Sequence, residues 1–253
     1  MAHQFKKKFG QNFLRDENLL KKIVSTAQIK NQHVIEIGPG EGGLTKYLVK
    51  EAKTIKAYEI DESLKHTLEK LETINPNLEV IFKDFLSVEN FDTKDTNIIG
   101  NIPYNITSPI LFKILDIEHI TSATFMVQKE FAERLSAQPN SKAYNALSVM
   151  MQLSFDVTYA FTVTKKVFYP IPKVDSAVIT LKRTSSPNKE LHAFIKDCFQ
   201  QKRKTLLNNL FETRAINKSQ TASFLEELGY SSQVRAEQII QKDFIKLYSK
   251  TLT

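Results

Sequence analysis

The sequence predicts an α/β protein: a mostly parallel sheet covered by helices on both faces, followed by a small all-helical domain. Three observations predict this fold. In the first half, short apolar segments alternate with amphipathic segments, as crossover connections between parallel strands require. A glycine-rich loop directly follows the first apolar segment. After the linker at residues 184–188 every segment has helical periodicity. We therefore expect one domain over residues 1–184 and a helical one over 185–253.

In the first half, each element follows from its own residues. Asp16 is a candidate N-cap for a helix with Leu19, Leu20, Ile23 and Val24 on one face. Further on, either Asp61 or Ser63 can cap a helix. The expected strands are 33–37, 54–60, 78–82, 97–100 and 124–127, and the expected helices are 16–27, 44–51, 63–71 and 107–115.

The pattern changes after Val127. Residues 129–135 and 144–153 are expected to be helices, and residues 155–163 and 177–181 to be strands. Between these strands, the prolines of residues 167–176 exclude regular structure. The C-terminal helices are expected at 190–200, 202–211, 221–228 and 243–250.

Positive charge is concentrated at the two ends of the chain, which has 253 residues and a net charge of +7. Residues 1–22 contain six Lys or Arg against two Asp or Glu, and residues 186–253 contain eleven against seven, a net +4 each. The middle therefore carries −1. A polyanion bound by the flanks of a neutral body explains this pattern, as do ordinary solubilising lysines.

Several classes of protein are disfavoured. No apolar segment is long enough to cross a bilayer, and the first residues lack an apolar signal core. Cys198 is the single cysteine, which excludes an internal disulfide and fits a reducing compartment. The five histidines are too far apart in sequence for a short metal-ligand pattern. We expect a cytoplasmic protein without a membrane partner or a metal.

The glycine-rich loop predicts a nucleotide-type cofactor. Gly38, Gly40 and Gly43 form G-x-G-x-x-G between a strand and a helix, and Glu59 ends the next strand. Such glycines allow close approach of a ligand, and the acidic residue can accept both hydroxyls of an adenosine ribose. Nicotinamide, flavin and S-adenosylmethionine binders share this pattern, so it does not distinguish among them.

Three further features favour a methyltransferase. Glu36 precedes the loop and makes it Glu-x-Gly-x-Gly. Asp84 ends the third strand, where it can bind the adenine amine of the cofactor or simply cap the next helix. The fourth strand ends in Asn101, Ile102, Pro103 and Tyr104. This sequence supplies an amide oxygen, a backbone carbonyl, a fixed φ and an aromatic face, which suit a flat ring with an exocyclic amine. A plain proline turn is the simpler alternative.

The chain resembles the ribosomal RNA adenine N6-dimethyltransferases, and most of all their small-subunit (16S) branch. Ile102 replaces a leucine common among the nearest relatives but does not separate the branches, and Lys202 replaces a common arginine. Residues 9–13 and the C-terminal helices favour the 16S branch. The matching segments are residues 9–14, 35–40, 100–104, 126–131, 168–176, 199–206, 228–229 and 235–237.

This resemblance implies a Rossmann-like class I methyltransferase domain with S-adenosyl-L-methionine as cofactor. The implied reaction is dimethylation of N6 of two adjacent adenosines in the 3′-terminal hairpin of 16S rRNA, in the immature small ribosomal subunit, by a monomer. The implied cofactor residues are Asn12 and Leu14 closing over it, Gly38 lining it, Glu59 at the ribose, Asp84 at the adenine and Asn101 beside the target base.

The remaining candidates concern the RNA. Tyr104 and Phe168 can stack on the two faces of an everted base, although Phe168 is equally suited to a core. Lys202, Arg203 and Lys204 lie on an expected helix that either binds phosphates or is simply solvated. With them lie Gln200, Gln201, Asn208 and Asn209. An arm that orders on RNA, or plain disorder, explains Lys6, Lys7 and Lys8.

Two other functions remain open from the residues. A nicotinamide-dependent oxidoreductase can use the same glycine loop. A non-catalytic RNA-binding assembly factor can keep the fold without the reaction, although the Asn-x-Pro-Tyr sequence and the cofactor loop are both intact.

Overall fold

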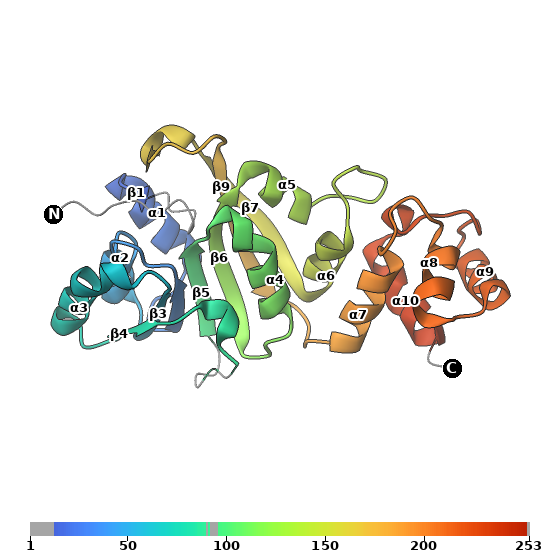
Figure 1. The fold of residues 1–253 in the computed structure, drawn as a ribbon, viewed down its shortest axis with the longest axis horizontal. Coiled ribbons are helices and arrows are strands. Elements are labelled where there is room, and N and C mark those ends of the chain that lie inside the picture. Colours follow the sequence, from blue (N-terminus) through green and yellow to red (C-terminus); the bar gives the residue numbers. More distant parts are fainter. Residues whose placement is uncertain (1–12, 90, 92–95, 252–253) are drawn as a thin grey trace. The chain divides into compact units, whose positions relative to one another are not determined.

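The computed structural model describes residues 13–89, 91 and 96–251 (Figure 1). The chain divides into two compact units. The first contains residues 1–132 and 157–183, and the second contains residues 133–156 and 184–253. None of the helices in the described ranges is long and apolar enough to cross a membrane.

A seven-stranded sheet forms the first unit, with strand order β4-β3-β2-β5-β6-β9-β7. Strands β4, β3, β2, β5 and β6 are parallel neighbours, and β9 runs antiparallel to β6. The predicted mostly parallel sheet is confirmed. The strands are β2 (His33–Ile37), β3 (Thr54–Glu59), β4 (Leu78–Phe82), β5 (Thr96–Asn101), β6 (Ile120–Gln128), β7 (Phe155–Val163) and β9 (Ser176–Arg183).

Helices and short turns connect these strands. The Asp16 side chain accepts a hydrogen bond from the Leu19 N–H at 3.0 Å, which confirms the predicted cap of α1. Asp61, rather than Ser63, caps the turn before α3, through the Ser63 N–H at 3.1 Å. The helices are α1 (Glu17–Ala27), α2 (Thr45–Glu51), α3 (Lys65–Ile74) and α4 (Thr107–Leu115); the 3-10 turns are Glu62–Leu64, Phe85–Ser87, Tyr104–Ile106 and Lys165–Val167.

Both faces of the central strands are buried. Val34 and Ile99 belong to an apolar cluster that also contains Leu20 and Ile23 of α1. Their neighbours along the strands point to the opposite face and are equally buried. Burial on both sides explains why these strands are continuous apolar runs rather than alternating ones.

The order of the strands reverses between β2 and β5. From β2 the chain moves outward to β3 and β4, then returns to β5 on the other side of β2. Parallel sheets bind ligands outside the carboxyl ends of the strands at such a point. The two strands lie so close here that a Cβ on Gly100 would be 2.7 Å from the Ile37 carbonyl oxygen, so only glycine fits.

The second unit is helical. Helix α6 packs on α7 and α10, and the Tyr144 hydroxyl donates a hydrogen bond to the Ile239 carbonyl at 3.0 Å. Residues 133–156 therefore group with the C-terminal helices, so the second unit contains more of the chain than the domain predicted over residues 185–253. The helices are α5 (Lys129–Leu135), whose end enters this unit, α6 (Ala146–Ser154), α7 (Lys189–Cys198), α8 (Leu206–Arg214), α9 (Lys218–Glu227) and α10 (Gln241–Thr251), with a 3-10 turn at Ala236–Gln238.

The prediction of a helix over residues 202–211 is wrong at its beginning, because α8 begins at Leu206. The Thr205 side chain caps it by accepting a hydrogen bond from the Asn208 N–H at 3.3 Å. A threonine side chain that accepts a hydrogen bond from a backbone N–H of the first turn favours the beginning of a helix directly after it. Residues 202–204 lie in turns ahead of the helix.

Candidate active site

A pocket lies at the carboxyl ends of the parallel strands in the first unit. It brings together side chains that are far apart in sequence, because those ends meet at one edge of the sheet. The described candidates that line it are Leu14, Gly38, Glu59, Asp84, Asn101, Ile102, Pro103 and Tyr104, with Glu36 and Gly40 beside them. The Asn12 prediction lies outside the described residues.

The loop after β2 is shaped by left-handed glycines. Gly38, Gly40 and Gly42 have φ of 68°, 59° and 79°, a region that other residues rarely adopt. Gly43, which the motif singled out, has no such φ, and a Cβ there would make only an ordinary van der Waals contact, 3.5 Å from the Leu14 carbonyl oxygen. The loop therefore depends on a glycine outside the predicted motif.

Glu59 organises the same loop. Its Oε2 accepts a hydrogen bond from the Gly40 N–H at 3.0 Å, and its Oε1 accepts one from the Asp61 N–H at 2.8 Å. The side chain is buried, which raises the pKa of its carboxyl, and the backbone N–H donors of Asp61, Gly40 and Ile60 oppose that shift. A carboxylate has lone pairs for about four donors, so Glu59, which lines the pocket, can accept a further hydrogen bond.

Glu36 is a buried acid in the pocket lining. Burial raises the pKa of its carboxyl to about 8, and repulsion from Glu59 acts in the same direction. Its Oε2 has no hydrogen-bond partner among the described residues. These surroundings therefore favour the protonated form of the Glu36 carboxyl.

The pH dependence of stability should reveal this proton. Because the folded-state pKa of Glu36 lies above the unfolded value, its contribution is complete below about pH 4.5 and is lost as pH rises through about 8. Relative to Glu36→Gln, which cannot titrate, the wild-type free energy of unfolding should fall by about 1.4 kcal/mol per pH unit in this window. Denaturant melts at pH 5, 6, 7 and 8 measure the difference, and parallel curves would exclude a buried proton.

The predicted capping role of Asp84 is confirmed, while its role toward the cofactor stays a prediction. Its Oδ1 accepts a hydrogen bond from the Leu86 N–H at 2.9 Å and so caps the turn after β4, while the residue also lines the pocket. A single cap uses one oxygen of the carboxylate. The capping role therefore does not compete with a ligand.

The turn after β5 has the predicted composition. Asn101 ends the strand and lines the pocket, and the Ile102 N–H donates to the Met126 carbonyl at 3.1 Å. The Pro103 carbonyl accepts from the Ile106 N–H at 3.1 Å, which closes the 3-10 turn that carries Tyr104. The Ile102 carbonyl receives no hydrogen bond from the described residues. An amide side chain and a backbone oxygen are thus adjacent at the pocket.

A residue to which the sequence assigned no role, Ser176, holds Tyr104. The two hydroxyls share a hydrogen bond of 2.8 Å, and Ser176 is fully buried at the first position of β9. Burial raises the pKa of Tyr104. Only its place in the segment 168–176 could have drawn attention to Ser176, because the pair is separated by 72 residues.

Removing the Ser176 hydroxyl should loosen the Tyr104 ring. We expect Ser176→Ala to lower kcat about two- to tenfold, the value of one buried hydrogen bond, with unchanged cofactor affinity. Tyr104→Phe should lose as much, and the double variant no more than either, because both remove the same interaction. Additive losses in kcat, with matching losses in melting temperature, would instead indicate two independent structural roles.

Of the two alternatives for Phe168, the structure has the core, so the predicted contact with the target base is wrong. It forms β8 (Phe168–Tyr169), which pairs with β1 (Phe13–Leu14), and its side chain is buried in the same apolar cluster as Leu14 and Ile23. It is not among the residues that line the pocket. The ring packs here because the short β1–β8 pairing turns it toward α1 and the sheet, so Phe168 does not supply the predicted second stacking face.

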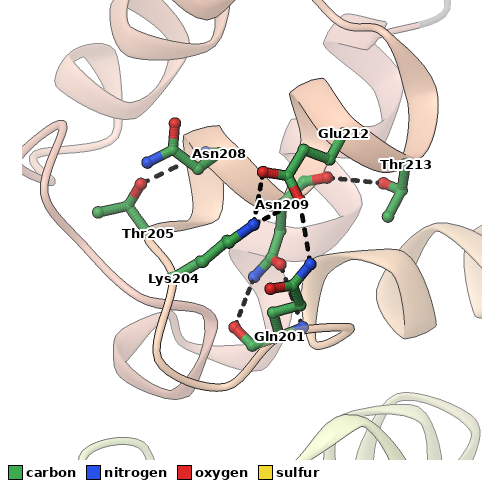
Figure 2. A network of polar contacts seen from close by, with 7 residues as sticks. All are labelled: Gln201, Lys204, Thr205, Asn208, Asn209, Glu212 and Thr213. Atoms are coloured by element: carbon green, nitrogen blue, oxygen red, sulfur yellow. Dashed lines mark hydrogen bonds and ion pairs between the residues drawn. The ribbon is translucent and has the colours of Figure 1, made fainter.

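The basic segment before α8 is partly engaged within its own unit. Lys204 Nζ pairs with Glu212 at 2.6 Å (Figure 2), and Lys202 Nζ lies 3.6 Å from Glu237. Arg203 has no ion pair among the described residues. Exposed pairs of this kind are weak and can exchange for a phosphate. Lys6, Lys7 and Lys8 lie outside the described residues.

The predicted role of Asn209 in binding phosphate is wrong. Its side chain is buried and holds the preceding turn: Oδ1 accepts from the Gln201 N–H at 3.1 Å (Figure 2), and Nδ2 also donates to the Cys198 carbonyl at 2.9 Å. With its polar atoms occupied and shielded from solvent, this side chain cannot reach RNA. No group of three or more His, Cys, Asp or Glu side chains in the described ranges is arranged to hold a metal.

A family model described as "Ribosomal RNA adenine dimethylase" matches residues 2–249. The chain belongs to this family. It is an S-adenosylmethionine-dependent rRNA adenine dimethyltransferase.

Known relatives match this dimethylase over nearly their full length. "Ribosomal RNA small subunit methyltransferase A" of Aster yellows witches'-broom phytoplasma is 47% identical, covering 99% of this chain and 97% of the relative. The Mycoplasmopsis pulmonis protein of the same name is 44% identical, with coverages of 96% and 97%.

Solved structures agree with the fold. A dimethyladenosine transferase from Plasmodium falciparum has a TM-score of 0.81 at 29% identity, covering 94% of this chain and 98% of that one. The 23S rRNA methyltransferase ErmE has a TM-score of 0.73 at 28% identity, with coverages of 95% and 100%. Because this fold is shared with an enzyme named for 23S rRNA, while the relatives above are named for the small subunit, the fold alone does not select the rRNA.

Proposed function

We propose that this dimethylase transfers methyl groups to N6 of two adjacent adenosines in the 3′-terminal hairpin of 16S rRNA, during small-subunit assembly. One observation carries the proposal: the Asn101–Tyr104 turn lines the same pocket as Glu59 and Asp84. A site for an exocyclic amine and a site for an adenosine cofactor are thus contiguous.

The residues at the pocket suit the cofactor. Glu59 accepts the ribose hydroxyls, Asp84 accepts the adenine amine, and the glycine loop with Gly38 lets the backbone lie against the ligand. Leu14 covers the pocket from β1. When bound, S-adenosyl-L-methionine supplies an electrophilic methyl group on a sulfonium.

The turn after β5 activates the amine. An adenine N6 is a poor nucleophile because its lone pair is delocalised into the ring. The Asn101 Oδ1 and the Ile102 carbonyl accept its two hydrogens, which draws them from the ring plane and localises the lone pair. Tyr104 stacks on the everted base, and Ser176 fixes that ring.

The step needs alignment more than a base. Nitrogen forms the new bond to carbon as the carbon–sulfur bond breaks, and the nitrogen then loses one proton. The methylated amine is acidic enough to release this proton to solvent, so Asn101 and its neighbours contribute by position. The second transfer requires that the same pocket accept an amine with one methyl group.

The choice of 16S rRNA rests on the relatives. Those 42–47% identical over nearly the whole chain carry a small-subunit name, whereas the 23S enzyme is 28% identical. Residues 9–13 and the C-terminal helices point in the same direction. The enzyme acts on an immature subunit as a monomer in the cytoplasm, where its single buried thiol, Cys198, stays reduced.

Undermethylated small subunits test the proposal. Incubated with the protein and labelled S-adenosylmethionine, they should gain label as dimethyladenosine at two neighbouring positions of the 3′ hairpin. Binding of the cofactor without label in adenine would exclude this function. Label in 23S rRNA would instead indicate a 23S-directed enzyme.

The basic turn before α8 should contribute to RNA binding through counterion release. Replacing Lys202, Arg203 and Lys204 by alanine should flatten the salt dependence of RNA affinity, by up to about 0.9 in slope for each phosphate that is no longer neutralised. Arg203→Ala alone should account for more of the change than Lys204→Ala, because Lys204 must first leave Glu212. Binding titrations at several salt concentrations measure the slopes. An unchanged slope would show that this turn does not contact the RNA phosphates.

A further inference from the structure

Basic side chains lie over aromatic rings on both flanks of α1. Lys21 Nζ is 5.7 Å from the centre of the Tyr47 ring on α2, while the next residue, Lys22, places its Nζ 4.0 Å from the Phe161 ring on β7. Just before the helix, the Arg15 guanidinium lies 4.8 Å from the Tyr169 ring. Three cation–ring contacts thus lie close to α1.

The cluster around Tyr47 carries uncompensated charge. Lys46 and Lys50 of α2 also place their Nζ atoms 5.1 and 5.6 Å from this ring, so three ammonium groups converge on it. Lys46 alone of the three pairs with a carboxylate in the described part of the chain, Glu17 at 3.5 Å. Like charges held this close repel one another, and a polyanion would relieve that repulsion.

The surrounding segments are basic as well. Residues 15–27, 45–51 and 164–175 contain eight Lys or Arg against four Asp or Glu, a net +4. Two of the four carboxylates are already used in the fold: Asp16 caps α1, and Asp175 accepts from the Lys165 N–H at 2.9 Å. Seven of the eight basic residues are exposed and Lys46 is half-buried, so the excess of positive charge faces solvent.

The surface begins at the rim of the active-site pocket. Leu14 lines that pocket, and Arg15 follows it directly, reaching Tyr169 on the strand paired with β1. Tyr169 is 51% exposed, and beyond it Ile171 and Val174 are 64% and 44% exposed. Apolar and aromatic area next to cations suits bases as well as phosphates.

We propose that this region binds the single-stranded RNA flanking the target adenosine, and we call it the α1 surface: Arg15, Lys21, Lys22, Lys46 and Lys50 with Tyr47, Phe161 and Tyr169. Unpaired nucleotides can place bases on the rings while the ammonium groups contact phosphates. In a duplex the bases stack on one another, so their faces are not available to these aromatic rings. The inference rests on the proposed rRNA substrate and names a contact for it that is separate from the residues before α8.

Binding of two labelled RNAs tests the α1 surface: the 3′ hairpin with single-stranded flanks, and the same hairpin without them. Lys21→Ala/Lys46→Ala/Lys50→Ala should reduce the salt slope for the flanked RNA by up to about 2, at roughly 0.7 per phosphate contact of a single strand. Tyr169→Ala should weaken that RNA roughly tenfold, and Tyr169→Phe should not, because the ring is what stacks. The hairpin without flanks should be bound equally by all these proteins.

Lys53→Ala/Lys65→Ala/Lys70→Ala is the matched control, because it removes three exposed lysines of the same unit that do not belong to the α1 surface. Equal losses in both triple variants would reduce the effect to net charge and overturn the α1 surface. Wild-type affinity of the α1 variants for the flanked RNA would also overturn the α1 surface. That result would leave the proposed methylation of subunits uncontradicted. A wild type that binds flanked RNA at the α1 surface but labels no adenine would contradict only the proposed reaction.

Discussion

Asn101→Ala should lower kcat about 10²- to 10³-fold, because an acceptor aimed at charge that develops in a transition state is worth roughly 3–4 kcal/mol. RNA affinity should change less than about threefold, since Asn101 is one side chain in a large, phosphate-dominated interface. Single-turnover methylation of undermethylated subunits measures the first quantity, and filter binding of the RNA measures the second.

The chain offers a close control for this substitution. Asn105 lies four residues on in the same turn, is exposed and is not part of the pocket. Asn105→Ala should therefore methylate at the wild-type rate. If Asn101→Ala reduced RNA affinity and turnover to the same extent, Asn101 would be a binding residue and its acceptor role would be excluded.

Glu59→Gln should raise the Kd for S-adenosyl-L-methionine about 100-fold, a loss of the order expected for charge-assisted hydrogen bonds. Both carboxylate oxygens accept from backbone N–H groups, of Gly40 and Asp61. An amide nitrogen in place of either oxygen would point a donor at a donor, so the glycine loop would lose its anchor in either orientation. Isothermal titration calorimetry with the cofactor measures the change.

Glu62→Gln controls for the loss of one negative charge near the pocket, because Glu62 is exposed three residues along the chain. It should bind the cofactor like the wild type. A Glu59→Gln protein that kept full affinity and an unchanged melting temperature would show that this carboxylate neither holds the ribose nor anchors the loop.

The sequence predicted most of the sheet because its signals are local. Strand positions such as Val34 and Ile99 lie in continuous apolar runs, and Asp16 sits one residue before a helical stripe, as a cap must. The candidate site was predictable for the same reason: a parallel sheet places the ends of β2, β3, β4 and β5 at one edge whatever the side chains between them. Glu59, Asp84 and Asn101 therefore meet in one pocket.

Errors arose where a local signal had two outcomes. Lys202 was expected at the beginning of a helix, but the cap at Thr205 begins that helix at Leu206 and leaves Lys202 in a turn. Asn209 looked like a solvent-facing amide, but it holds the backbone of that turn. Phe168, open to either a core or a ligand, lies in the core because β8 pairs with β1.

By itself, then, the sequence determined the strands of the parallel sheet, the cofactor loop and the Asn-Ile-Pro-Tyr turn, because hydrophobic periodicity and turn chemistry act over a few residues. The tertiary structure alone decided that Ser176 holds Tyr104, that residues 133–156 join the C-terminal helices, and that α1 places its lysines over rings of α2 and β7. Each of these depends on contacts between residues distant in the chain, which are set by how buried faces pack and not by the local pattern of either partner.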